Sequence, residues 1–346
     1  MRFTMWLIIA LGGGLYDPIP KPLPGLASHA LQGRGFYTRK LLTIVFISAY
    51  WEYSILHLYL SVTSVTSVMS LELKHYLTAW QLSDPQPLAQ TSTSHVYTVQ
   101  HAGKTVVLKL LTPLGVKDES SGAVALRHFD GHGAVRLLHS DTGAHLLEYA
   151  NGDDLIPMVA RGQDEAATVI IADVLNKLHD QPLGTVPDRL VTLRRWFRSL
   201  FRKAATDQDK GERSILVRAA PVAEGLLSDP VDVRVLHGDI HHGNIRHVSG
   251  RGWLAFDPKG LVGERTYDAA NTLCNPMDMP ELVTDEARLL RNVDLLSKHA
   301  WLDQARLLAF VFAYACLSAS WSLEDGQSPN TALEVAAIIE PHVRSF

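Results

Sequence analysis

Cysteine is scarce in this chain of 346 residues, which holds only Cys274 and Cys316. Two cysteines exclude a disulfide framework and a four-cysteine zinc site, so we predict two reduced core thiols and a cytoplasmic setting. An excess of positive charge is absent too. The 32 Lys and Arg against 36 Asp and Glu give a net charge of −4 and no sign of nucleic-acid binding. The remaining composition, 47% hydrophobic and 20% charged, is that of a globular protein with a sizeable core.

The first 68 residues differ from the rest of the chain. "MWLIIALGGGL" is too short to span a bilayer, and no convincing signal-peptide cleavage site follows it. Leu41 to Leu60 is about long enough for a membrane helix, but Glu52 and His57 make its insertion costly. One interpretation is a weak membrane anchor. The other, which we favour, is that residues 1–68 are not part of the functional protein and that a chain beginning at Met69 folds and is active.

Residues 69–150 have the pattern of a small β-rich lobe. Residues 95–100 and 105–111 are β-rich and flank the turn "HAGK", which predicts a hairpin. A short helix in "VKDESSGAVALRHF" and two strands around "SDTG" follow. The resulting β-β-α-β-β order predicts an antiparallel sheet with one helix.

Residues 151–346 are predicted to be a mostly helical lobe. "DEAATVIIADVLNKLHD" repeats apolar residues at helical spacing, and "RLVTLRRWFRSLFRKAA" does so beside a basic face that we interpret as solvated. Leu307 to Leu323 carries no charge, but it is short for a membrane span, so we predict a buried core helix. The chain is therefore predicted to be an α+β protein of two lobes.

The stretch "RVLHGDIHHGNIRHVSGRGWLAFDPKG" carries the chemistry. Asp239 and Asn244 are predicted on one loop after a short strand, and Asp257 ends a hairpin that returns beside that loop. Such oxygen ligands suit Mg²⁺ together with phosphate oxygens and water, and they leave Asp239 to orient a hydroxyl nucleophile. The spacing D-x-x-x-x-N, followed by an Asp at the end of a strand, is typical of kinase catalytic loops.

A histidine metal site is the alternative interpretation of the same stretch. It requires His237, His241 and His242 to bind zinc or a similar ion. His241 and His242 are adjacent in a loop and tend to point apart, and no established zinc spacing fits. The phosphoryl-transfer interpretation is therefore favoured.

The run from "VLHGDIHHGNI" to "WLAFDPKGLVGERTYDAAN" resembles the signature of the aminoglycoside phosphotransferase family, in particular its streptomycin 6-kinase and hydroxyurea phosphotransferase branch. "GAVRLL", "LLEYA" and "YACLSASW" also match, so the resemblance covers roughly residues 80–340. It implies a protein-kinase-like fold and transfer of the ATP γ-phosphoryl group to a small-molecule hydroxyl. The 6-hydroxyl of streptomycin is the expected acceptor, with antibiotic resistance as the result. Hydroxyurea, an endogenous metabolite and a nucleotide-binding protein without catalysis are the alternatives.

The resemblance also implies the roles of five residues. Asp239 is the catalytic base or hydroxyl-orienting carboxylate, while Asn244 and Asp257 hold Mg²⁺ against the ATP phosphates. Lys109 grips the α- and β-phosphates. Glu119, at the start of the following helix, is its expected ion-pair partner, with Asp118 as the competitor.

Further positions match the family less directly. Glu148 to Ala150 correspond to the segment between the lobes, whose main chain binds adenine in this family. His237 is expected to brace the catalytic loop and Asp268 to steady it. Four acidic residues after the active-site segment are candidates to attract a cationic acceptor, although a solvated helix start is at least as good an explanation: Asp278, Glu281, Asp285 and Glu286.

Two departures from the kinase pattern stand out. The loop "LAQTSTSHVYTV" lacks G-x-G-x-x-G, so Thr91 to Ser94 would have to cradle the phosphates with main-chain N–H and hydroxyl groups. Asp257 is followed by Pro258 and Lys259 instead of Phe-Gly, which argues against a protein-kinase activation switch and favours a small-molecule substrate.

Overall fold

The computed structural model describes residues 71–181, 184 and 186–343. The predicted N-terminal extension, residues 1–68, and its possible membrane segment lie outside the described residues, so both stay predictions. Residues 71–79 are helical and belong to a unit that ends at Leu82. All elements named below belong to the second unit, which contains the chain from Ser83 onward.

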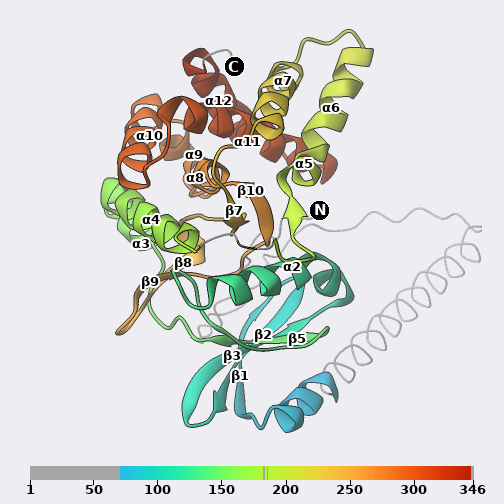
Figure 1. Cartoon of the computed structure of the whole chain (residues 1–346), viewed down its shortest axis with the longest axis vertical. Helices are drawn as coiled ribbons and strands as arrows, with labels where there is room; N and C mark the ends of the chain where they lie inside the picture. The colour runs from blue at the N-terminus through green and yellow to red at the C-terminus, as the bar shows by residue number, and fades with distance from the viewer. Residues whose placement is uncertain (1–70, 182–183, 185, 344–346) are drawn as a thin grey trace, which may run out of the picture. The chain divides into compact units, whose positions relative to one another are not determined.

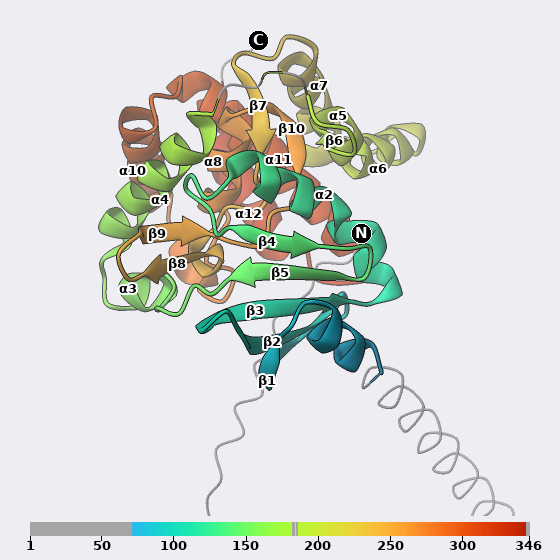
Figure 2. The same cartoon turned by 60° about the horizontal axis from the view of Figure 1, so that its bottom comes forward.

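A five-stranded antiparallel sheet makes the small lobe, with the strand order β1-β2-β3-β5-β4. Figure 2 shows β3, β5 and β4 side by side. The predicted β-β-α-β-β order is confirmed, with one more strand, β1, at the edge. The strands are β1 (Ser83–Gln90), β2 (Ser94–His101), β3 (Lys104–Leu111), β4 (Leu137–Ser140) and β5 (Ala144–Glu148).

The single helix of this lobe, α2 (Pro113–Phe129), contacts both the sheet and the large lobe. Thr112 caps it, because its hydroxyl accepts a hydrogen bond from the N–H of Gly115 at 3.2 Å and Pro113 stands in the first turn. Asp130 ends the helix in a left-handed conformation. The beginning of α2 therefore lies directly after β3, and β3 carries Lys109.

The large lobe contains short strands and many helices (Figure 1). β10 pairs with β6 in parallel and with β7 antiparallel, and β8 and β9 form the predicted hairpin. Its strands are β6 (Val191–Thr192), β7 (Val233–Leu236), β8 (Ile245–Val248), β9 (Gly252–Ala255) and β10 (Leu261–Glu264). Its helices are α3 (Ile156–Ala160), α4 (Asp164–His179), α5 (Leu193–Trp196), α6 (Arg198–Asp209), α7 (Ile215–Ser228), α8 (Thr266–Leu273), α9 (Pro280–Val283), α10 (Glu286–His299), α11 (Gln304–Glu324) and α12 (Asn330–Ile339), with short 3-10 turns η1 (His242–Asn244) and η2 (Glu340–His342).

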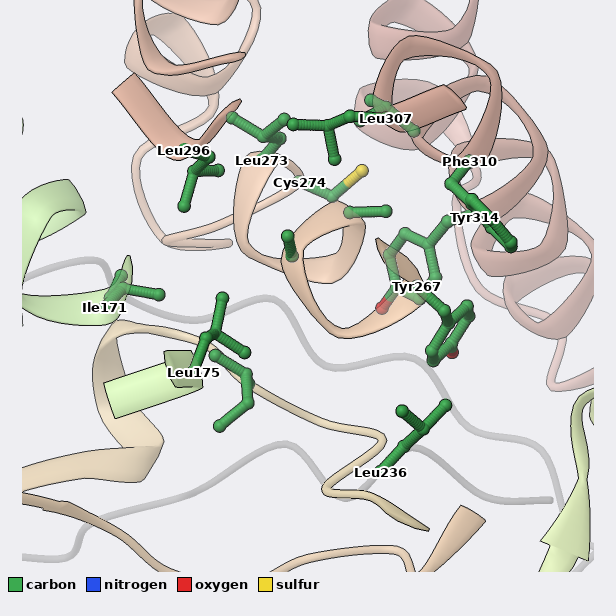
Figure 3. Packing of buried hydrophobic residues seen from close by; sticks show 14 of the residues in the cluster. Ile171, Leu175, Leu236, Tyr267, Leu273, Cys274, Leu296, Leu307, Phe310 and Tyr314 are labelled. Atoms are coloured by element: carbon green, nitrogen blue, oxygen red, sulfur yellow. The ribbon is translucent and has the colours of Figure 1, made fainter. Parts of the chain in front are cut away.

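Helix α11 runs through the core of this lobe. Among the described residues it is the one helix that is long and apolar enough to cross a membrane, but 72% of that apolar window is buried inside the protein. Tyr267 of α8 packs edge-on against Phe310 and Tyr314 of α11 (Figure 3). The prediction of a buried core helix is confirmed. The packing also anchors α8, which lies beneath the catalytic loop.

The basic face predicted as solvated is exposed and paired with acids. The Arg194 side chain is 53% exposed and binds Glu224 through two hydrogen bonds of 2.7 and 2.8 Å. Arg202 is 63% exposed and binds Glu324 at 2.7 Å. These two guanidinium groups already have carboxylate partners, which favours the solvated interpretation.

Candidate active site

The catalytic loop follows β7, and one buried carboxylate on α8 fixes its start. The Asp268 oxygens accept hydrogen bonds from the main-chain N–H groups of His237 (2.9 Å) and Gly238 (2.7 Å). His179 of α4 lies 3.0 Å from the same carboxylate. Asp268 is fully buried. The loop therefore leaves the strand in one orientation, as was expected of Asp268 from the sequence.

His237 ties the catalytic loop to the hairpin that returns beside it. Its Nε2 donates to the carbonyl of Phe256 at 3.0 Å, and its Nδ1 accepts from the N–H of Asp239 at 3.3 Å. Burial lowers the pKa of His237 to about 4, although nearby carboxylates oppose the shift. The ring is neutral near pH 7, and it acts as a brace.

Asp239 is held at both its main chain and its side chain. Asn271 of α8 donates to Asp239 Oδ1 at 3.0 Å, and the carboxamide of Asn244 donates to the Asp239 carbonyl at 3.0 Å. Burial opposes ionisation of this carboxyl. The positive charge of Lys259 and the surrounding donors outweigh that opposition and hold its pKa below the ordinary value. Asp239 is therefore an oriented, ionised carboxylate.

Asp257 joins the two lobes through a lysine. Lys109 Nζ lies 2.5 Å from Asp257 Oδ1 and also pairs with Glu119 of α2. The expected Lys109–Glu119 pair is therefore present, while the side chain of Asp118 lies outside what the structure describes. Asp257 has a positive φ of 61°, which is uncommon for a non-glycine residue and turns the chain sharply after the hairpin. Burial opposes ionisation of Asp257, but Lys109 and Lys259 hold its pKa well below the ordinary range.

Two glycines allow α2 to approach this site so closely. A Cβ at Gly122 of α2 would lie 2.2 Å from the carbonyl oxygen of Pro258, and one at Gly260 would lie 2.0 Å from the carbonyl oxygen of Ser121. Main-chain atoms on both sides cannot give way cheaply. The contact sets α2 against the turn after Asp257 and so places Glu119, three residues before Gly122, beside Lys109. Sequence reasoning missed it, because no local pattern shows which glycines face each other.

The residues present fit a Mg²⁺ ion bound together with phosphates. Asp257 offers a carboxylate. Asn244 uses the N–H₂ group of its side-chain amide to bind the Asp239 carbonyl, so the amide oxygen, the atom that could bind the ion, is not the atom used in that hydrogen bond. One or two oxygen side chains plus substrate phosphates are the usual Mg²⁺ environment in kinases. No group of three His, Cys, Asp or Glu able to hold a metal exists among the described residues.

The three histidines of the alternative metal site lie in different surroundings. His237 faces Phe256, and His241 Nδ1 accepts from the N–H of Gly243 at 3.1 Å. His242 is fully buried, 4.0 Å from Asp164. Because the three rings serve separate contacts, the histidine-cluster interpretation was wrong.

The turn between β1 and β2 closes on itself. The Thr91 hydroxyl accepts hydrogen bonds from the N–H groups of Thr93 (3.2 Å) and Ser94 (3.0 Å). The Thr93 carbonyl is bound by the Thr112 N–H at 2.8 Å. The N–H groups of Thr91, Thr93 and Ser94, three of the four predicted to cradle phosphates, are therefore already used within the turn.

The segment between the lobes begins where β5 ends. The Glu148 carboxylate accepts from the Arg136 N–H at 3.0 Å and pairs with Arg251, while the Glu148 N–H donates to the Arg136 carbonyl at 2.9 Å. That N–H group is not available to adenine. Ala150 is buried and follows directly, so adenine recognition by this segment would fall to its remaining main-chain groups.

The four acidic residues proposed to attract a cation divide into two pairs. Asp285 caps α10 by accepting from the Arg288 N–H at 2.6 Å, and Glu286 lies 3.0 Å from His342. Those two have structural partners. Asp278 and Glu281 are exposed.

His242 gives a prediction about acid stability. Neither ring nitrogen has a hydrogen-bond partner among the described residues, and burial, with the nearby Arg288 charge, lowers its pKa to about 3. The folded pKa lies below the unfolded value of about 6.5, so stability is lost as the pH falls below about 6.5. When the pH is lowered from 7 to 5, protonation of this residue in the unfolded state should reduce the free energy of unfolding by at most about 2 kcal/mol.

We expect the His242→Leu variant to lose less free energy of unfolding than the native protein between these two pH values. Urea unfolding at pH 7 and 5 measures both. Parallel losses in the two proteins would contradict the assignment.

Comparison with known proteins gives one consistent picture. A sequence profile described as aminoglycoside/hydroxyurea antibiotic resistance kinase matches residues 79–326. A streptomycin 3''-kinase of Klebsiella pneumoniae is 38% identical over 252 residues, which cover 71% of this chain and 91% of that protein. A streptomycin 6-kinase of Streptomyces glaucescens is 30% identical, covering 76% and 84%. A hydroxyurea phosphotransferase of Kitasatospora aureofaciens is 31% identical, covering 75% of each chain.

Solved structures support the fold. A thermostable mutant of aminoglycoside phosphotransferase APH(4)-Ia, in a ternary complex with ADP and hygromycin B, is 15% identical. The match covers 79% of this chain and 99% of that one, with a TM-score of 0.56. An ethanolamine kinase of Plasmodium vivax matches with a TM-score of 0.53 at 15% identity, covering 75% and 82%. The predicted protein-kinase-like, two-lobed fold is confirmed.

Proposed function

The chain belongs to the aminoglycoside/hydroxyurea antibiotic resistance kinases and is a phosphotransferase that acts on small-molecule hydroxyl groups, and we propose that it phosphorylates streptomycin with ATP. The observation that carries the proposal is the group of ion pairs at the site, which includes one between the two lobes. Lys109 of the small lobe meets Asp257 of the large lobe at 2.5 Å, and Asp239 shares Lys259 with Asp257. Lysines and carboxylates are thereby gathered where a phosphoryl group and a hydroxyl can meet.

Asp239 orients the acceptor. Its carboxylate is ionised at neutral pH and fixed by Asn271, so it can accept a hydrogen bond from the substrate hydroxyl and aim the oxygen lone pair at phosphorus. A low pKa makes it a weak base early in the reaction. Its contribution is therefore mainly orientation, with the proton passing to it late.

The remaining residues hold the nucleotide. Asp257 and Asn244 would hold Mg²⁺ against the ATP phosphates. When bound, the ion would neutralise part of the phosphate charge. Lys109, kept in place by Glu119, would bind the α- and β-phosphates. The segment from Glu148 to Ala150 would contact adenine. Because the enzyme consumes ATP, we place it in the cytoplasm.

The phosphorylated position on streptomycin is the finer part of the proposal. The family resemblance predicts the 6-hydroxyl, whereas the relative with 38% identity is a 3''-kinase and those with 30% are 6-kinases. We therefore expect the 3''-phosphate. The position is read directly from the phosphorus-coupled proton in the NMR spectrum of the product.

The test is ADP release by the full chain with Mg-ATP and a panel of streptomycin, other aminoglycosides and hydroxyurea. We expect release that depends on streptomycin. Release with hydroxyurea alone would favour the second candidate, since one relative with 31% identity is a hydroxyurea phosphotransferase. ATP binding without acceptor-dependent release from any compound would overturn an antibiotic as the substrate.

A further inference from the structure

Lys259 lies between the two carboxylates of the site. Its Nζ is 3.3 Å from Asp257 Oδ2 and 3.4 Å from Asp239 Oδ2, and the side chain is 31% exposed. Its main-chain N–H donates to the His237 carbonyl at 2.7 Å. The backbone of Lys259 is therefore fixed to the start of the catalytic loop, while its ammonium group reaches the centre of the site.

The two lysines of the site approach opposite oxygens of Asp257. Lys109 contacts Oδ1 from the side of α2 and Glu119, whereas Lys259 contacts Oδ2 from the side of Asp239. Of these two lysines, Lys259 is the one that contacts Asp239. The positive charge next to the hydroxyl-orienting carboxylate is therefore that of Lys259.

With the acceptor held by Asp239 and the nucleotide held at Asp257, the phosphoryl group in transfer would lie close to both carboxylates. The acceptor oxygen, aligned by Asp239, forms a bond to the γ-phosphorus. The bond from that phosphorus to the bridging oxygen breaks, its electron pair goes to ADP, and the hydroxyl proton passes to Asp239. Negative charge is carried by the three oxygens of the group in transit.

We propose that Lys259 is a further catalytic residue, whose ammonium group binds the oxygens of the γ-phosphoryl group during transfer; this rests on the proposed kinase function. The ammonium lies 3.4 Å from the carboxylate of Asp239 and 3.3 Å from that of Asp257, so it stands between the residue that would orient the acceptor and the residue that would hold the metal. A fixed cation at the place where charge is carried lowers the barrier strongly. Lys109, in contrast, serves the phosphates that stay with ADP.

The assignment predicts a difference between ATP and ADP, because only ATP has the γ-phosphate. For the full chain with Lys259→Met, we expect the rate of acceptor phosphorylation to fall by ~10²-fold or more. We expect ATP binding, measured by calorimetry without acceptor, to weaken about tenfold while ADP binding changes by less than about threefold. Lys109→Met should weaken the binding of both nucleotides.

Three comparisons keep the test decisive. Lys298→Met removes one positive charge from an exposed position, where Lys298 pairs with Asp294, and should change neither rate nor binding. Lys259→Arg keeps the charge and should retain the preference for ATP. This variant keeps the proposal testable if Lys259→Met does not fold. The proposal is overturned if Lys259→Met keeps a rate within about threefold of the native protein, or weakens ATP and ADP binding equally.

The binding measurement separates this proposal from the choice of acceptor. If streptomycin is not a substrate but ATP binds, the ATP-to-ADP comparison still tests Lys259. A loss of ATP selectivity in Lys259→Met would support the residue even while the acceptor proposal fails.

Discussion

Replacing Asp239 by Ala is expected to abolish phosphoryl transfer and to leave ATP binding nearly intact. The variant removes the carboxylate that orients the acceptor hydroxyl, whereas Lys109, Asn244 and Asp257 keep their positions for the nucleotide. Loss of a positioned general base lowers rates by ~10²–10⁴-fold. Acceptor-dependent ADP release measures the first effect, and calorimetric titration with ATP measures the second.

The control for this variant is Asp294→Ala. Asp294 is 44% exposed on α10 and pairs with Lys298, so the substitution removes one carboxylate from the surface of that helix. It should leave transfer unchanged. Near-normal turnover by Asp239→Ala would remove this residue as the key carboxylate. A loss of ATP binding equal to the loss of rate would instead mean that the variant disturbs the loop as a whole.

Asn271→Ala extends the same argument to a residue that the sequence did not single out. Asn271 donates to Asp239 Oδ1 from α8, a helix that is buried along its whole length. The substitution leaves the carboxylate in place and removes its alignment. Turnover at saturating substrates should fall by about tenfold, less than for Asp239→Ala, while ATP binding is unchanged. A rate as low as that of Asp239→Ala, or one equal to that of the native protein, would contradict a positioning role.

Much of the site could be predicted because its signals are local. Asp239 and Asn244 lie five residues apart on one loop, and the strand before them and the hairpin after them have plain β-patterns. The pairing of Lys109 with Glu119 was implied by the family resemblance, although the strand and the helix that carry these residues also follow from the local pattern. Such short-range geometry is set by strand and turn propensities.

The parts that the sequence left open depend on how distant segments meet. Lys259 was noticed only as a departure from the kinase pattern, because its reach to Asp239 depends on the turn after Asp257. Asn271 depends on which face of α8 is turned toward the catalytic loop. In the fold, the buried state of α11 was predictable from its length and small residues, whereas the contact of α2 with residues 258–260 was not.

That contact gives the other prediction with a large expected effect, the substitution Gly122→Ala. The added methyl carbon would lie 2.2 Å from the Pro258 carbonyl oxygen, far inside van der Waals contact. Because main chain lies on both sides, α2 must move away from the turn, at a cost of ~1–3 kcal/mol in stability. Glu119 moves with it and leaves Lys109. We therefore expect phosphoryl transfer to fall by more than tenfold, because a displacement of this size misplaces the nucleotide.

Gly211→Ala is the matched control, because it separates lost stability from a displaced helix. Gly211 has a positive φ of 75° and nothing within 4 Å of an added Cβ, so alanine there strains the backbone by about 1 kcal/mol and touches nothing. Both variants should melt at lower temperature, but only Gly122→Ala should lose activity well below its melting point. It should then resemble Glu119→Gln, in which the helix stays and the charge is lost. Full activity in Gly122→Ala would mean that α2 can shift without disturbing Lys109, and the site would not depend on this close approach.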